Sequence, residues 1–296
     1  MSNRAIRGVL ALLPTVFDRK GDLDLEGFRD NIRYLEGTGI HGAVAMASMG
    51  QYYLTNDEEF RILASITREE CQRMTCIIGC HWQNTKEAVA RTKYAEDIGA
   101  DFAFIIPPYY SSWLDGESCY AHYKAIHDAT NEIQIMLYNF QNANFTVDAE
   151  LYDRLLRDFP RITAVKECTP TIEMGEIIRR YGDRLSVFSG SETALYLNML
   201  LGGAGAIGVN ALAYPKFVLK FYDACLNKRW DDARRYDYLL NSHISRRVPE
   251  RYRIDIKGIA AAAGRKAGFQ RAPYENPDQR DLDFHSEWLR KIGEIE

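Results

Sequence analysis

The chain has 296 residues, of which 46% are hydrophobic, enough to build one large or two small packed domains. Its formal net charge is −4 and its 37 lysine and arginine residues are scattered, so no nucleic-acid-binding surface is expected. No window approaches the ~20 apolar residues that span a bilayer, and residues 1–7 lack the apolar stretch of a secretory signal. We therefore expect a cytoplasmic protein that acts on a small molecule and does not contact a membrane.

Cysteine and histidine spacing indicates neither a metal site nor a disulfide framework. The six cysteines and six histidines form no Cys-x-x-Cys pair and no His-Glu-x-x-His motif. A phosphate-binding turn of the kind that pyridoxal phosphate enzymes use is also not found. We expect no bound metal and no cofactor.

Short apolar runs alternate with amphipathic segments, which is the pattern of parallel strands joined by crossover helices. Eight such runs occur, at residues 9–13, 42–46, 76–79, 102–106, 133–138, 162–166, 185–188 and 204–209. Capping residues and first-turn acids at 55–59 and 146–150 indicate helix starts between them. No linker interrupts the series, so we predict a (β/α)8 TIM barrel, an α/β fold, over residues 1–225.

A doubly wound sheet is the competing fold, but it requires a glycine-rich turn after the first strand. The sequence there is Pro14-Thr15-Val16-Phe17-Asp18. This segment therefore favours the barrel.

Residues 226–296 carry apolar side chains at helical spacing and are predicted to be additional C-terminal helices, packed on the barrel as one structural unit. Pro273, Pro277 and the charged residues as far as Asp283 indicate a surface loop. A short closing helix is expected around 287–295.

Lys166 stands at the end of the sixth predicted strand, where barrel enzymes place functional side chains. Alternation along the strand predicts Ile162, Ala164 and Lys166 on one face and Glu167 on the other. An amine in this apolar setting either pairs with a carboxylate or loses its proton and becomes a nucleophile for a ketone. A structural ion pair with Glu167 or another acid at the barrel mouth is the alternative.

Tyr138 ends the neighbouring fifth strand, where its phenol could relay protons to and from a carbinolamine, although packing alone would also account for it. Residues 47–51 form a small turn after the second strand whose backbone N–H groups could bind a carboxylate.

Together these segments resemble the dihydrodipicolinate synthase / N-acetylneuraminate lyase family of pyruvate-dependent, class I Schiff-base aldolases. Val165-Lys166-Glu167 resembles the family's Schiff-base strand, and Tyr138-Asn139 its catalytic tyrosine motif. The resemblance covers nearly the whole predicted barrel. It implies a covalent role for Lys166 and a proton-relay role for Tyr138.

Other positions acquire expected roles only through this resemblance. Tyr110, the second tyrosine of Pro108-Tyr109-Tyr110, would reach a neighbouring subunit's site and complete the relay with Ser48, as expected in a homotetramer built as a dimer of dimers. Met49 would offer its backbone N–H to the keto-acid carboxylate. Gly190 and Ile207 would line the pyruvate pocket.

The chain departs from the family at the segment that follows Asn139. Dihydrodipicolinate synthases carry there an arginine that binds the carboxylate of their aldehyde substrate, whereas this chain has residues 140–145 with the sequence Phe-Gln-Asn-Ala-Asn-Phe. We expect Phe140 and Asn142 from this segment to contact the substrate. Glu192 could bind a substrate hydroxyl or cap the helix that follows it.

Further apolar and aromatic residues on the predicted loops suggest an apolar or aromatic aldehyde partner, although they could instead pack loops or a subunit contact. They are Met46, Met49, Tyr52, Tyr53, Trp113, Phe140 and Phe145. The leading hypothesis is an aldolase or hydratase-aldolase that makes or cleaves a C–C bond next to a 2-keto acid. A keto-acid or sugar-acid dehydratase using the same imine, and a non-catalytic keto-acid-binding barrel, are the alternatives.

Overall fold

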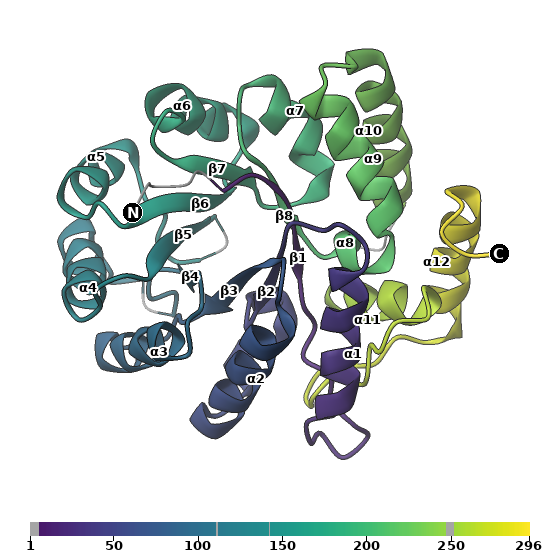
Figure 1. Ribbon diagram of the computed structural model, residues 1–296, viewed down its shortest axis with the longest axis horizontal. Coiled ribbons are helices and arrows are strands. Elements are labelled where there is room, and N and C mark those ends of the chain that lie inside the picture. Colours follow the sequence, from purple (N-terminus) through teal and green to yellow (C-terminus); the bar gives the residue numbers. More distant parts are fainter. Residues whose placement is uncertain (1–5, 111, 142, 247–251) are drawn as a thin grey trace.

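The computed structural model describes residues 6–110, 112–141, 143–246 and 252–296. Eight parallel strands form a closed barrel in chain order, and the first strand pairs with the last (Figure 1). The strands are β1 Gly8–Leu12, β2 Gly42–Ala45, β3 Thr75–Gly79, β4 Phe102–Ile105, β5 Gln134–Phe140, β6 Ile162–Cys168, β7 Ser186–Ser189 and β8 Gly205–Gly208. The predicted TIM barrel is confirmed, and each predicted run overlaps one strand, although several strands begin or end one or two residues outside the run.

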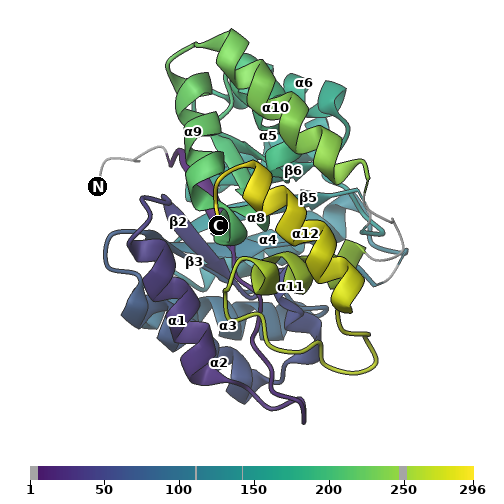
Figure 2. The same cartoon turned by 90° about the vertical axis from the view of Figure 1, so that its right-hand side faces the viewer.

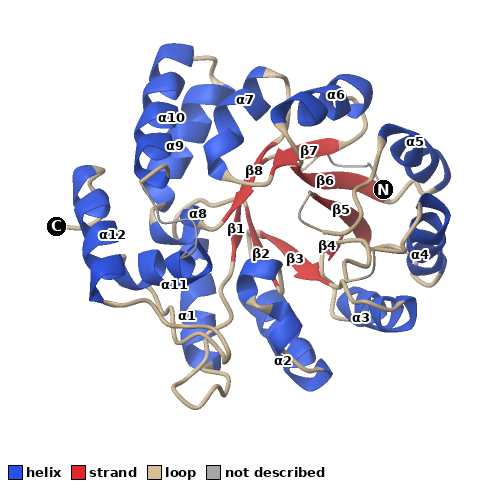
Figure 3. Ribbon diagram, turned by 180° about the vertical axis from the view of Figure 1, so that it is seen from behind, coloured by secondary structure: helices blue, strands red, loops and turns tan. Residues whose placement is uncertain are grey.

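Helices surround this ring of strands (Figure 3). The helices that follow the strands are α1 Leu25–Glu36, α2 Asp57–Glu70, α3 Thr85–Asp97, α4 Gly116–Asp128, α5 Ala149–Asp158, α6 Thr171–Tyr181, α7 Leu195–Leu200, α8 Asn210–Ala213 and α9 Pro215–Leu226, the last two both after β8. Short 3-10 turns occur at η1 Ser48–Gly50, η2 Tyr52–Leu54 and η3 Glu192–Ala194. The C-terminal helices are α10 Trp230–Ile244, α11 Tyr252–Ala262 and α12 Gln279–Lys291.

Side-chain caps fix the start of several helices. Asp24, Asn84, Asp115 and Asp148 each accept a hydrogen bond from a backbone N–H in the first turn of the helix that follows. At α2, Asn56 makes a reciprocal capping box with the third helical residue. These caps satisfy N–H groups that lack partners within the helix, so each strand-to-helix connection ends at a defined residue.

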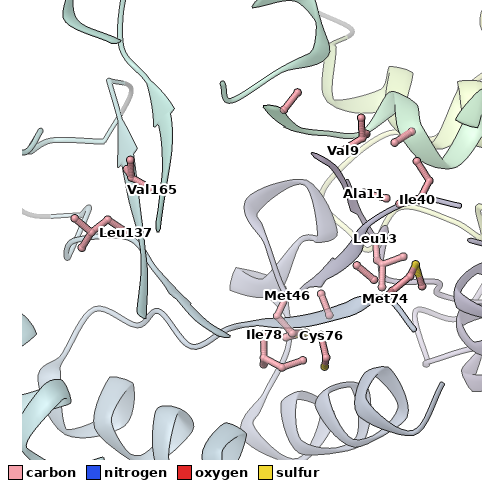
Figure 4. Close-up of a cluster of buried hydrophobic side chains, with 14 of the residues drawn as sticks. Val9, Ala11, Leu13, Ile40, Met46, Met74, Cys76, Ile78, Leu137 and Val165 are labelled. Carbon is pink, nitrogen blue, oxygen red and sulfur yellow. The ribbon is translucent and has the colours of Figure 1, made fainter. Parts of the chain in front are cut away.

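The strands separate two apolar layers. Alternate side chains such as Val9, Ile78 and Val165 face the helices and form the outer layer, part of which is shown in Figure 4. The intervening residues face into the barrel and fill it; these include Leu10, Phe104, Met136, Ala164 and Phe188. Because the barrel interior is packed with side chains, side chains of the strands can reach an open site at the ends of the strands but not along the barrel axis.

One element of the predicted alternation was wrong. Ile162 belongs to the outer layer, whereas Ala164 lies inside the barrel. The pairing of β5 with β6 shifts by one residue between Ile135 and Met136, so that Ile135 pairs with Ile162 and Met136 with Ala164. This β-bulge restores the alternation by Ala164 and leaves Lys166 on the inner face, as expected.

The C-terminal segment lies against the outside of the barrel, where α11 packs against α12 and α8 (Figure 2). Helix α12 also contacts α10, where Trp288 stacks on His243 with 4.6 Å between ring centroids. Trp288 of α12 packs edge-on against Phe217 of α9, with 5.6 Å between ring centroids. Helix α12 begins at Gln279 and not near residue 287, because Asp278 and Asp281 form a capping box that starts it earlier than predicted. The division of the chain at residue 225 stays a prediction; α9 ends one residue beyond it.

Ile78 offers a test of the outer layer, because its side chain is fully buried in β3. Replacing Ile78 with alanine should lower the free energy of unfolding by about 2–5 kcal/mol, since it removes buried methyl groups and leaves a cavity. Urea denaturation measures this. The half-exposed Leu226 is the control, for which Leu226→Ala should cost less than about 1 kcal/mol. Equal losses in the two variants would contradict the layer assignment.

Candidate functional site

A cavity of about 330 Å³ opens at the carboxyl ends of the strands. Its walls come from the ends of β1, β5, β6 and β8 and from the loops after β2, β7 and β8. The lining residues are Leu12, Ser48, Met49, Tyr138, Phe140, Lys166, Cys168, Gly190, Ser191, Glu192, Gly208 and Val209. Of the predicted site residues, this cavity therefore brings together Ser48, Met49, Tyr138, Phe140, Lys166, Gly190 and Glu192.

Lys166 and Tyr138 meet at the centre of this cavity wall. Their backbones pair directly across β5 and β6, and both side chains are only 3% exposed. The Lys166 amine donates a hydrogen bond to the Tyr138 hydroxyl at 3.3 Å and lies 4.3 Å from the centre of its ring. The rings of Phe104 and Phe140 each stack with the Tyr138 ring, at 4.7 and 5.3 Å between centroids, and these contacts hold the phenol in place.

The acid next to the lysine points to the other side of the strand. Glu167 accepts hydrogen bonds from the Tyr152 hydroxyl at 2.8 Å and from the Asn139 amide at 3.2 Å. Burial raises the pKa of Glu167, and these donors oppose the rise. The carboxylate is thus engaged in the outer layer, away from the face that carries Lys166.

Opposing effects act on the pKa of the Tyr138 phenol. Burial raises the pKa of the phenol, while the positive charge of Lys166 and hydrogen bonds with Lys166 and Ser48 act to lower it. The net direction is upward, so the phenol keeps its proton at neutral pH. A protonated phenol that touches both an amine and a hydroxyl can pass a proton between them.

Cys168 is a cavity residue that the sequence interpretation missed. It follows Lys166 by two positions on β6 and therefore shares its face. Burial raises the pKa of the Cys168 thiol, with the Lys166 charge acting in the opposite direction. Gly190 makes room for the sulfur, because a Cβ at position 190 would lie 2.0 Å from Cys168 Sγ. The alternation rule that selected Lys166 would also have selected this residue.

Glu192 forms part of the cavity wall and also caps a helix. One carboxylate oxygen accepts hydrogen bonds from the backbone N–H groups of Asn210 and Ala211, each at 3.0 Å, and the other accepts one from the Asn210 amide at 2.9 Å. The capped helix is α8, after the next strand. Gly208 permits this arrangement, since a Cβ there would lie 1.9 Å from the carboxylate.

Two predicted site residues lie elsewhere. Ile207 is fully buried in the inner layer of the barrel, and its neighbours Gly208 and Val209 line the cavity. Tyr110 is 83% exposed; its backbone is held by Gln83 and Asn144, and its side chain is not part of the cavity wall. Asn142 lies outside the described residues.

The predicted aromatic mouth is also smaller than expected. Only Met49 and Phe140 of that group line the cavity. Met46 and Tyr52 are buried in the core, where Tyr52 packs edge-on against His81, and Trp113 is 92% exposed. Several of these side chains therefore pack loops, which was the alternative interpretation.

The described part of the chain holds no cluster of three or more His, Cys, Asp or Glu side chains arranged to bind a metal ion. Within the same residues, none of the helices combines the length and apolar character needed to cross a membrane.

The sequence matches known proteins over most of its length. The model of the dihydrodipicolinate synthetase family matches residues 5–289. An uncharacterized DapA-like lyase of Thermococcus kodakarensis is 32% identical over 78% of this chain and 80% of that protein. A 4-hydroxy-tetrahydrodipicolinate synthase of Thermodesulfovibrio yellowstonii is 30% identical over 98% of this chain and 99% of that protein.

Solved structures agree with this assignment. A dihydrodipicolinate synthase crystal structure has a TM-score of 0.88 and 26% identity, and the match covers 98% of this chain and 100% of that one. YagE of Escherichia coli K12, crystallised in complex with pyruvate, shares the fold with a TM-score of 0.88 and 22% identity over 98% of this chain and 99% of that one. The chain belongs to the dihydrodipicolinate synthetase family of pyruvate-dependent lyases and synthases, and is an enzyme of the class I, Schiff-base type.

Proposed function

We propose that Lys166 is the nucleophile that forms the Schiff base with pyruvate or another 2-keto acid. The observation that carries this proposal is the contact of its amine with the Tyr138 hydroxyl, 3.3 Å away, on the wall of a cavity at the carboxyl end of the barrel. A buried lysine is easier to deprotonate than an exposed one, and the neutral amine attacks carbonyl carbon.

The proposed reaction uses the two side chains in sequence. The amine of Lys166 adds to C2 of the keto acid, the carbinolamine loses water, and the protonated imine draws the electron pair of a bond at C3. Tyr138 supplies and removes the protons as the carbinolamine forms and collapses. Ser48, whose hydroxyl faces the same cavity and acts to lower the pKa of Tyr138, extends this relay.

The keto-acid carboxylate is proposed to bind at η1. The backbone N–H groups at the start of any helical turn lack acceptors within the turn, and here they belong to Ser48 and Met49 on the cavity wall. Met49 contributes through its backbone. Its thioether adds apolar surface beside the substrate.

The second substrate is proposed to be an apolar or aromatic aldehyde. Leu12, Met49, Phe140, Cys168 and Val209 contribute apolar or weakly polar surface to the cavity. Within the described cavity wall, Lys166 is the one cationic side chain, so a second carboxylate would lack the forked partner that arginine offers. Lysine-pathway synthesis is therefore disfavoured.

We further propose a homotetramer in which Tyr110 completes the relay of a neighbouring subunit. The exposed side chains of Tyr110 and Trp113 lie on the loop after β4. A second group of exposed apolar residues on and around α6 and α7 could form the other contact of a dimer of dimers: Ile172, Leu197, Leu200 and Leu201.

Reductive trapping tests the nucleophile. Incubation with pyruvate and sodium borohydride, followed by peptide mass spectrometry, should place one reduced pyruvate on Lys166, and Lys166→Ala should abolish the adduct. Lys266→Ala is the control, because Lys266 is exposed on the C-terminal segment. An adduct that persists in Lys166→Ala would overturn the proposal. Product analysis with a panel of aldehyde adducts then separates C–C cleavage from water loss, which would indicate a dehydratase.

Tyr138→Phe should lower kcat by about 10²-fold or more while trapping at Lys166 continues at a slower rate, since the variant keeps the ring and loses the proton carrier. Steady-state kinetics measure kcat, and stopped-flow kinetics measure the rate at which the keto acid reacts with Lys166. A variant with the kcat of the parent chain would show that Tyr138 only packs against Lys166.

Tyr110→Phe should lower kcat about tenfold without unfolding the protein, because the missing hydroxyl lies on the surface of each chain. Mixed oligomers of Tyr110→Phe and Lys166→Ala chains should regain activity, since one shared site then contains both native residues. Size-exclusion chromatography should report a tetramer. An active monomer, or mixtures with no gain, would refute the shared site.

A further inference from the structure

A second buried lysine lies outside the cavity. Lys257 belongs to α11 of the C-terminal segment and is 1% exposed. Its amine donates hydrogen bonds to the backbone carbonyls of Thr15, at 2.9 Å, and of Phe269, and it lies 5.0 Å from the centre of the Phe17 ring. Burial lowers the pKa of Lys257 to about 7, with the nearby Arg271 acting in the same direction. A cation is costly to keep at such a position, so these carbonyl contacts must offset the cost.

The two carbonyls that Lys257 joins belong to segments that are already paired. Phe17 in the loop after β1 and Phe269 after α11 form an antiparallel bridge, in which the Phe269 N–H donates to the Phe17 carbonyl at 2.8 Å. Gly268 permits this approach: its φ is +61°, and a Cβ would lie 2.6 Å from the Phe17 carbonyl oxygen. Lys257 thus fastens the C-terminal segment to the β1 loop.

The β1 loop in turn holds the turn after β2. Thr15 is 1% exposed, and its hydroxyl donates a hydrogen bond to the Gly50 carbonyl at 2.5 Å. Gly50 approaches so closely that a Cβ would lie 2.8 Å from the Leu13 carbonyl oxygen. Gly50 ends η1, whose other two residues, Ser48 and Met49, form part of the cavity wall.

Arg271 provides a parallel connection to the same loop. Its guanidinium donates to the Leu54 carbonyl at 2.6 Å and forms an ion pair with Glu59 at 2.6 Å. Leu54 ends η2, directly after the turn that carries Ser48 and Met49. The β2 loop is therefore anchored to the C-terminal segment on both sides.

We propose that Lys257 is a positioning residue for keto-acid binding: through Thr15 and Gly50 it fixes the turn that receives the substrate carboxylate. The role in catalysis rests on the proposed function. The C-terminal helices accordingly act on the active site without touching the substrate. A displaced turn would weaken carboxylate binding, while the Lys166–Tyr138 pair on β5 and β6 would stay in place.

The experiment compares Lys257→Met, Thr15→Val and the exposed control Lys266→Met. Lys257→Met keeps the apolar stem and removes the donor, whereas Thr15→Val keeps the Thr15 carbonyl and removes its bond to Gly50. Each of the two should raise KM for pyruvate about tenfold, the effect of losing roughly one charge-assisted or buried hydrogen bond, with kcat changed less than about threefold. Lys266→Met should match the parent chain.

Hydrogen exchange measured by mass spectrometry gives a readout that does not depend on catalysis. Peptides covering residues 46–54 should exchange faster in Lys257→Met and Thr15→Val, while peptides covering 133–140 should not change. Where Lys257→Met does not fold, Thr15→Val decides.

Parent-like KM values in these variants, or a fall in kcat without a rise in KM, would overturn the positioning role. If the parent chain forms no trapped pyruvate adduct, the proposed function fails, and the exchange data alone decide the link. Unchanged hydrogen exchange of residues 46–54 in Thr15→Val would then refute the link between the Thr15 hydroxyl and the turn after β2.

Discussion

The site depends on one contact, that between the amine of Lys166 and the phenol of Tyr138 within an apolar wall. It exists because β5 and β6 are adjacent and parallel, with Tyr138 and Lys166 at the same level of the sheet. The closed ring forces both side chains toward the barrel axis, where little water reaches them. Burial raises the pKa of the Tyr138 phenol, which therefore keeps its proton. The proposed Schiff-base chemistry uses an amine in contact with a protonated phenol, and this pair provides both.

Much of the fold followed from the sequence, because buried parallel strands give continuous apolar runs that recur once per βα unit. Two local details could not be predicted from the sequence: the β-bulge in β6 and the start of α12. The bulge that turns Ile162 toward the helices adds one residue to an apolar strand and leaves no compositional trace. The start of α12 was misplaced because a charged stretch with prolines outweighed the capping box at Asp278.

The sequence predicted the reactive residues of the site better than the residues that line the rest of the cavity. Strand alternation predicted that Lys166 faces the cavity, and its place at the end of the neighbouring strand selected Tyr138. The alternation rule applied two residues beyond Lys166 would also have found Cys168. The aromatic lining was overestimated, since sequence alone does not distinguish a loop side chain that faces the substrate from one that packs inward, as Tyr52 does. The contact of Lys257 with the Thr15 carbonyl could not be foreseen, because it joins residues 242 positions apart.

Two glycines on the cavity wall limit how the pocket can diversify. Position 190 lies against the sulfur of Cys168, and position 208 against the carboxylate of Glu192. A side chain can be gained at either glycine only when its neighbour becomes smaller, so these positions can vary only in matched pairs. Substrate range is then most freely altered at Ser191 and Val209, which line the same cavity and do not occupy the space beside either glycine.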